Sequence, residues 1–149
     1  MSYPELTTER MELLAEIYAN AQPAGTYYTG PTWFSMENSH KCLVILAVVS
    51  MAATSTLDLA ILEAQDANGT GEKAITGKAI TQLSAVLGDD HEVVFVNIRT
   101  EEMDANGGFT HLSVRTRVGT AASTYAVIVL GDIPRAAPVD VSRATEIVA

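Results

Sequence analysis

Apolar and polar positions alternate along much of the chain after residue 40, which is the pattern of half-buried β-strands. The clearest example is residues 110–118, where Leu112, Val114 and Val118 fall on one side and His111, Ser113, Arg115 and Arg117 on the other. Similar alternation predicts strands over residues 56–63, 92–99 and 124–130. Residues 41–52 form a nearly continuous apolar run, which predicts a strand buried on both faces. Residues 73–87 fit a short helix or a strand.

Near the start of the chain, apolar residues recur with the 3.6-residue period of an α-helix, which predicts a helix over residues 6–21. Leu13, Leu14, Ile17 and Tyr18 would form one apolar stripe on such a helix. Thr7 or Thr8 can cap its first turn, where Glu9 and Glu12 suit the helix dipole. Pro23 and Gly25 then end it.

Residues 22–40 read as an irregular arm that is rich in aromatic side chains. Pro23, Gly25, Gly30 and Pro31 oppose any regular element, so the arm needs a surface to fix it. That surface is either its own domain or a partner. We expect the arm to be an attachment surface, because large amphipathic side chains are enriched at interface hot spots. The predicted interface residues are Tyr27, Tyr28, Trp33 and Phe34.

Turn signals separate the predicted strands. The tetrapeptide Asp-Ala-Asn-Gly occurs at residues 66–69 and 104–107, and Asn-Gly readily adopts positive φ in tight turns. Several short strands with regular turns predict a mostly β fold, a β-sandwich or jelly roll with a short N-terminal helix and an irregular aromatic arm. The predicted organisation is a helix and arm over residues 1–40, then a β-sandwich domain over residues 41–149 with an extended C-terminal tail.

The composition narrows the possible partners. The 149 residues carry a net charge of −9, and no cluster of Lys and Arg is present. Nucleic acid and anionic membranes bind clustered basic residues, so we expect neither as a partner. Charged residues make up only 18% of the chain, which suggests that a partner covers part of the surface. No signal peptide is visible, and the longest apolar run, residues 42–49, is far too short to span a membrane.

Residues that could carry chemistry are few. The single cysteine, Cys42, sits in the apolar run and reads as a buried hydrophobe, although His40 could share its strand face. The two Asp-Ala-Asn-Gly segments lack the later ligands of a calcium loop, and the three histidines are isolated. The glycines near residues 71–77 have the wrong spacing for a phosphate-binding loop. We therefore expect no enzyme activity, no cofactor and no metal.

Several phrases in the chain resemble small virion proteins of tailed phages. They are Thr-Leu-Asp-Leu-Ala-Ile-Leu-Glu-Ala-Gln-Asp-Ala-Asn-Gly-Thr-Gly from residue 56, Lys-Ala-Ile-Thr-Gly-Lys-Ala-Ile-Thr-Gln-Leu from residue 73, Asn-Ile-Arg-Thr-Glu-Glu-Met-Asp from residue 97, Gly-Phe-Thr-His-Leu from residue 108, and Val-Leu-Gly-Asp-Ile-Pro-Arg-Ala-Ala-Pro-Val from residue 129. The resemblance spans residues 42–139. It implies a particle component without enzyme activity, of a type encoded near the major capsid gene.

Within that class we expect a capsid decoration, or cement, protein. Such a protein is made in the host cytoplasm, binds the major capsid protein on the outer surface of the head and stabilises contacts between capsid subunits. The class also implies a homotrimer. One alternative is a head–tail connector or tail structural protein of the same particle. An alternative of another class is a carbohydrate-binding or hydrolytic β-sandwich, whose paired carboxylates would assemble only in space.

Overall fold

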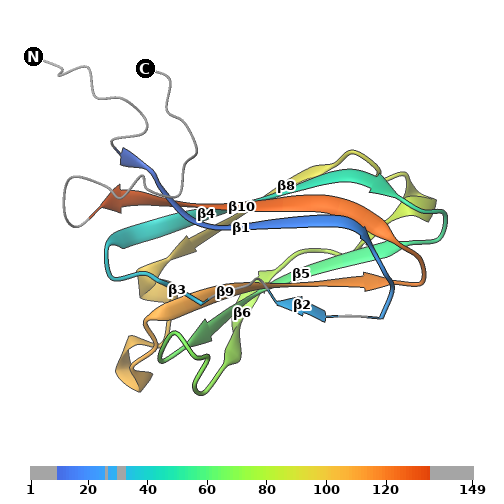
Figure 1. Cartoon of the computed structure of the whole chain (residues 1–149). Coiled ribbons are helices and arrows are strands. Elements are labelled where there is room, and N and C mark those ends of the chain that lie inside the picture. Colours follow the sequence, from blue (N-terminus) through green and yellow to red (C-terminus); the bar gives the residue numbers. More distant parts are fainter. Residues whose placement is uncertain (1–9, 26, 30–32, 135–149) are drawn as a thin grey trace, which may run out of the picture.

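The computed structural model describes residues 10–25, 27–29 and 33–134. These residues are mostly β, and they form two antiparallel sheets that lie one above the other (Figure 1). This arrangement is consistent with the predicted β-sandwich. The only helices in the described segments are three short 3-10 turns: η1 (Ala85–Leu87), η2 (Thr100–Glu102) and η3 (Ala105–Gly107).

Four strands form the first sheet, called sheet A here. Their spatial order is β1 (Glu12–Gln22), β10 (Ser123–Pro134), β4 (Ser39–Met51) and β8 (Val93–Arg99). The long strands β10 and β4 pair along nearly their whole length at its centre, and β1 and β8 form its two edges.

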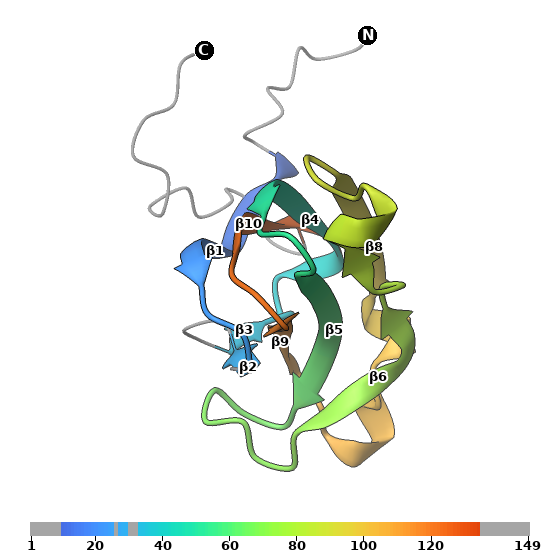
Figure 2. The same cartoon turned by 90° about the vertical axis from the view of Figure 1, so that its right-hand side faces the viewer.

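The second sheet, sheet B, is built around β9 (His111–Gly119) and β5 (Thr56–Ala64), which pair along their full lengths. Short strands complete it on either side: β2 (Tyr27–Thr29) and β3 (Phe34–Ser35) pair with β9, while β6 (Lys73–Ala79) and β7 (Leu83–Ser84) pair with β5. In Figure 2, β6 and β8 lie on the same side of the molecule.

One hydrophobic core fills the space between the sheets. Sheet A contributes Val44, Leu46 and Val127, and sheet B contributes Leu57 and Ile61, all almost fully buried. Leu14, Ile17, Phe34 and Met36 belong to the same core, so the segment before residue 40 adds strands to both sheets and side chains to their shared interior.

The predicted helix over residues 6–21 is wrong from residue 12 onward, and residues 6–9 lie outside the described residues. Residues 12–22 form strand β1, in which Leu14 and Ile17 are buried while Tyr18 is 74% exposed, so the supposed stripe does not share one side. A bulge between Leu13 and Ala15 breaks the strand alternation and imitates a helical period. Helix propensity is a weak preference, and pairing with the central strand β10 overrides it.

The predicted strands after residue 40 are confirmed with small shifts in their ends. The ambiguous residues 73–87 contain β6, β7 and η1. One detail is wrong: β4 is buried on one face only. Cys42, Val44, Leu46 and Val48 point into the core, whereas Val49 on the opposite face is 53% exposed.

Candidate binding surfaces

The described part of the aromatic arm packs on its own domain. Phe34 pairs with Leu112 in sheet B and is buried in the core. The Trp33 ring lies against Gly69, where a methyl group added to the backbone would come 2.5 Å from Trp33 Nε1. Tyr27 and Tyr28 lie in β2, whose backbone pairs with Arg117 and Thr116, but their side chains fall outside the described residues. An attachment role for these four aromatic residues stays a prediction.

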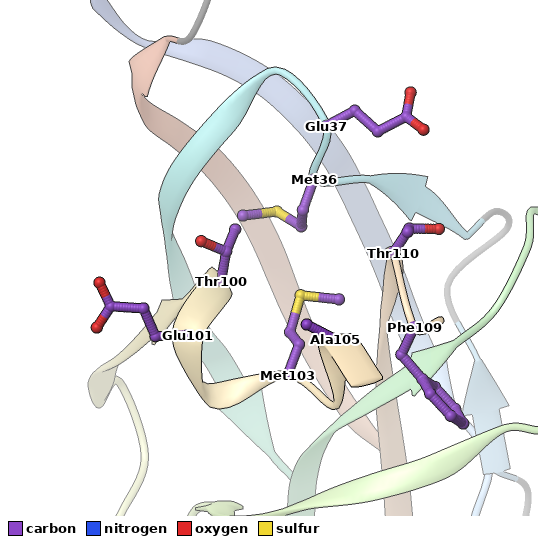
Figure 3. A pocket seen from close by; sticks show the side chains of 8 residues that line it. All are labelled: Met36, Glu37, Thr100, Glu101, Met103, Ala105, Phe109 and Thr110. Carbon is purple, nitrogen blue, oxygen red and sulfur yellow. The ribbon is translucent and has the colours of Figure 1, made fainter. Parts of the chain in front are cut away.

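A cavity of about 360 Å³ opens beside the end of the arm. Met36 and Met103 lie at its centre, and Glu37 and Glu101 point outward from its rim, while the ring of Phe109 is turned away (Figure 3). The thioethers give the cavity an adaptable apolar interior. A ligand that fits this lining would place a small apolar group against the methionines and a positive charge beside the two glutamates at the rim.

The loops that carry the two Asp-Ala-Asn-Gly segments meet at one end of sheet B, where Gln65 Nε2 donates a hydrogen bond to the Gly107 carbonyl at 2.8 Å. Lys73 Nζ lies 2.7 Å from Asp104 Oδ2 and 3.6 Å from Glu63 Oε1, and 4.1 Å from the centre of the Phe109 ring. Its hydrogen bond to Asp104 raises the pKa of Lys73, and the same bond lowers the pKa of the Asp104 carboxyl. The ion pairs also neutralise the buried Glu63 carboxylate, so this cluster joins the β5–β6 loop to the β8–β9 loop.

The two copies of the tetrapeptide form different turns. In the first, Asp66 Oδ1 accepts hydrogen bonds from the backbone of Asn68 and Thr70, and Gly69 has a φ of +80°. In the second, Gly108 has the left-handed backbone conformation. The tight-turn prediction had required that conformation at Gly107. Gly107 instead serves close packing, because an added Cβ would lie 2.7 Å from Asp104 Oδ2.

Cys42 faces the core, as the sequence suggested. Burial raises the pKa of the Cys42 thiol to about 12, so it stays protonated at neutral pH. His40 is exposed at the start of the same strand. This environment is the opposite of the one that activates a cysteine nucleophile.

The described part of the chain offers no candidate metal site. No group of three or more His, Cys, Asp or Glu residues there is placed to hold a metal ion. The described segments also contain no helix with the length and apolar character needed to cross a membrane.

The outer face of sheet A is unusually apolar, and it is the main surface that the sequence reasoning missed. Five of the seven exposed large hydrophobic residues lie on it, and the strand register sets them beside further half-buried apolar residues. Phe95 is opposite Ile45, and Ile45 is opposite Ile128. We call this surface the apolar face; its residues are Leu13, Tyr18, Leu43, Ile45, Ala47, Val49, Val93, Phe95, Ala126, Ile128 and Leu130.

The size of the apolar face is that of an interaction surface. Four strands spaced about 4.8 Å apart and four rows of side chains spaced about 6.8 Å apart give roughly 500 Å² in projection, and the polar residues Glu16 and Asn97 occupy part of that area. Apolar patches of about 300–600 Å² are the largest on typical monomers and are often functional. The apolar run at residues 42–49 was the signal for it, but that run was interpreted as a strand buried on both faces.

The comparisons with known proteins add no relative: no protein-family model matches the chain, and no curated protein matches its sequence.

Proposed function

We propose that the protein is a structural component of a tailed-phage particle, namely a decoration protein that docks on the major capsid protein at the outer surface of the head. The apolar face carries this proposal, because a flat sheet surface with exposed Phe95, Val93 and Val49 is suited to cover another protein. The resemblance to small virion proteins suggests that this other protein is the major capsid protein.

Charge supports the same function. The chain has a net charge of −9, yet Val93 to Ile98 in β8 and Leu43 to Met51 in β4 contain no charged residue. The apolar face therefore gains from burial, at the cost of desolvating Glu16 of β1, which lies opposite Ile128. The acidic remainder keeps the exposed side of a docked protein soluble.

Composition of purified particles tests the assignment. Particles from a lysate in which the gene is expressed are purified, and the ratio of this protein to the major capsid protein is measured on a stained gel. A decoration protein gives a ratio of the same order as the capsid subunits. A ratio lower by more than an order of magnitude points to a connector or tail component, and absence from particles contradicts a structural role.

A further inference from the structure

Strand β8 is an edge without the usual protection against pairing. Natural edge strands are shortened, bulged or charged so that they do not pair with other chains. In the described residues, β1 carries bulges and two glutamates, β6 carries two lysines and a register shift, and β2 and β3 have three residues or fewer. In contrast, β8 spans seven residues (VVFVNIR), pairs with β4 without a register shift, and has its only charge at its last residue.

Two hydrogen bonds fix which backbone groups of β8 face the open side. The Glu92 carbonyl accepts from Val48 N at 2.9 Å, so Glu92 is directed toward β4. Backbone direction alternates along a strand, so Val94 and Val96 also face β4, while Val93, Phe95 and Asn97 face away from it. The Asn97 carbonyl agrees with this, because it accepts from Lys78 Nζ at 2.6 Å on the open side.

Lys78 protects one end of this edge and leaves the other end open. Its ammonium group, bound to Asn97 O and 2.9 Å from Glu102 Oε1, closes the gap between β6 and β8 at that end. A groove of about 500 Å³ runs between β6 and β8, lined by half-buried Ile80 and Leu83 on one side and by residues 94–97 of β8 on the other. Among the described residues, no backbone hydrogen bond occupies the open side of Val93 and Phe95, so a further strand could pair there.

We propose that two copies of this chain pair through their β8 edges, antiparallel across a two-fold axis, so that sheet A continues from one copy into the other. Val93 of one copy would lie opposite Phe95 of the second copy, and each pair would exchange both backbone hydrogen bonds. A β-branched residue opposite an aromatic one is a favourable cross-strand pair. The contact is self-complementary, as a two-fold interface requires, and no charge between Val93 and Ile98 opposes it.

The pairing would change the shape of the docking surface. Residues directly opposite each other in an antiparallel pair lie on the same face of the sheet. The apolar faces of the two copies would therefore lie on the same side and form one continuous surface. Two linked docking faces hold a particle more firmly than two separate ones. The pairing itself does not depend on the proposed capsid role, since it needs no particle.

Sedimentation velocity of the full-length protein, without particles, tests the proposal. We compare Val93→Lys with Val49→Lys, because these valines are 54% and 53% exposed on the same apolar face but only Val93 is on the open edge. Circular dichroism establishes that both variants keep the wild-type fold. The wild type should form dimers, and Val93→Lys should raise their dissociation constant by about 100-fold because it sets a charge against an apolar strand. Val49→Lys should leave the dissociation constant within about threefold of the wild type, since its site is away from the edge.

Three results would overturn the proposal. One is a wild type that stays monomeric at all concentrations, in which case the edge is not used for pairing between copies. Another is equal weakening by both substitutions, which would mean that the apolar faces pack against each other. The third is an assembly, such as a trimer, that Val93→Lys does not affect. The first and third results leave docking to capsids untouched, whereas packing of the apolar faces against each other would also count against it, so the failures of the two proposals can be told apart.

Discussion

Gly69 and Gly108 share a left-handed backbone but differ in what surrounds them. Their φ angles are +80° and +77°, and only Gly69 lies against Trp33. Both alanine substitutions should cost about 1 kcal/mol of stability from backbone strain. Gly69→Ala should cost about 1–3 kcal/mol more, because the added methyl displaces the indole.

Thermal unfolding and fluorescence measure this difference directly. Trp33 is the only tryptophan, so its emission reports on this contact alone. We expect a red-shifted emission for Gly69→Ala and an unchanged spectrum for Gly108→Ala. Equal melting temperatures and equal spectra would mean that the arm does not pack on the β5–β6 loop.

The Cys42 thiol should be inert in the folded protein. With a pKa raised to about 12 by burial, it has almost no thiolate at pH 8, and reagents cannot reach it. We expect a thiol-reactive dye to label the native chain only as fast as it unfolds, and to label it at once in denaturant. Rapid labelling of the native chain would contradict the buried placement.

The environment of a single residue could be predicted from the sequence where one physical cause determines it. Cys42 was expected in the core because its neighbours on the same strand face are apolar, and it is there. Gly107 was assigned the positive φ of a tight turn, yet Asp104 Oδ1 accepts a hydrogen bond from Gly107 N and closes a 3-10 turn, which moves that conformation to Gly108. Such local competition between turn types depends on contacts that the sequence alone does not display.

At the scale of elements, the alternating strands were predictable and β1 was not. The strands β5, β8, β9 and β10 show their period because one side of each faces the core, whereas β4 was recognised from its continuous apolar run. In β1 the bulge and the exposed Tyr18 disturb that period, and Ala, Glu and Leu favour a helix locally. Only the long-range pairing with β10 identifies it as a strand. The outer face of sheet A was missed for a related reason, since apolar periodicity cannot tell a covered face from an exposed one.

The link between β6 and η2 should make stability depend on acid pH. The hydrogen bond from Arg99 N, followed by the one from Lys78, lowers the pKa of Glu102 below its ordinary value of 4.5. Because the folded pKa is the lower one, this stabilisation is complete above pH 4.5 and is lost as the pH falls through the folded pKa. Glu102→Gln should thus cost at most about 1 kcal/mol at pH 7, since solvent screens this partly exposed pair, and less near pH 3, where more of the carboxyl is protonated.

Denaturant unfolding at both pH values checks this dependence. Glu101→Gln is the matched control, because Glu101 is an exposed neighbour in the same turn. It should follow the wild type at either pH. A Glu102→Gln deficit of the same size at both pH values would show that the carboxylate charge does not link the two sheets.

At the scale of the whole molecule, the two sheets are unequal. Sheet B carries the aromatic arm, and sheet A lies above it with β1 and β8 at its edges (Figures 1 and 2). The outer face of sheet A exposes apolar side chains that an enclosed core does not need, and exposing them costs solubility. We therefore propose that the outer side of sheet A contacts other proteins, with the capsid on its face and a second copy at its edge.

Titration of purified heads that lack this protein tests the central claim most directly. Bound protein is measured after pelleting the heads, for the wild type, for Ile128→Lys at the centre of the apolar face, and for Leu87→Lys, which alters an exposed residue of η1 outside that face. We expect saturable binding to the heads by the wild type and by Leu87→Lys. Ile128→Lys should keep its fold but bind at least about 30-fold more weakly, the loss expected when an anchor worth about 2 kcal/mol is removed. Heads that bind no wild-type protein, or that bind Ile128→Lys as well as the wild type, would contradict the account.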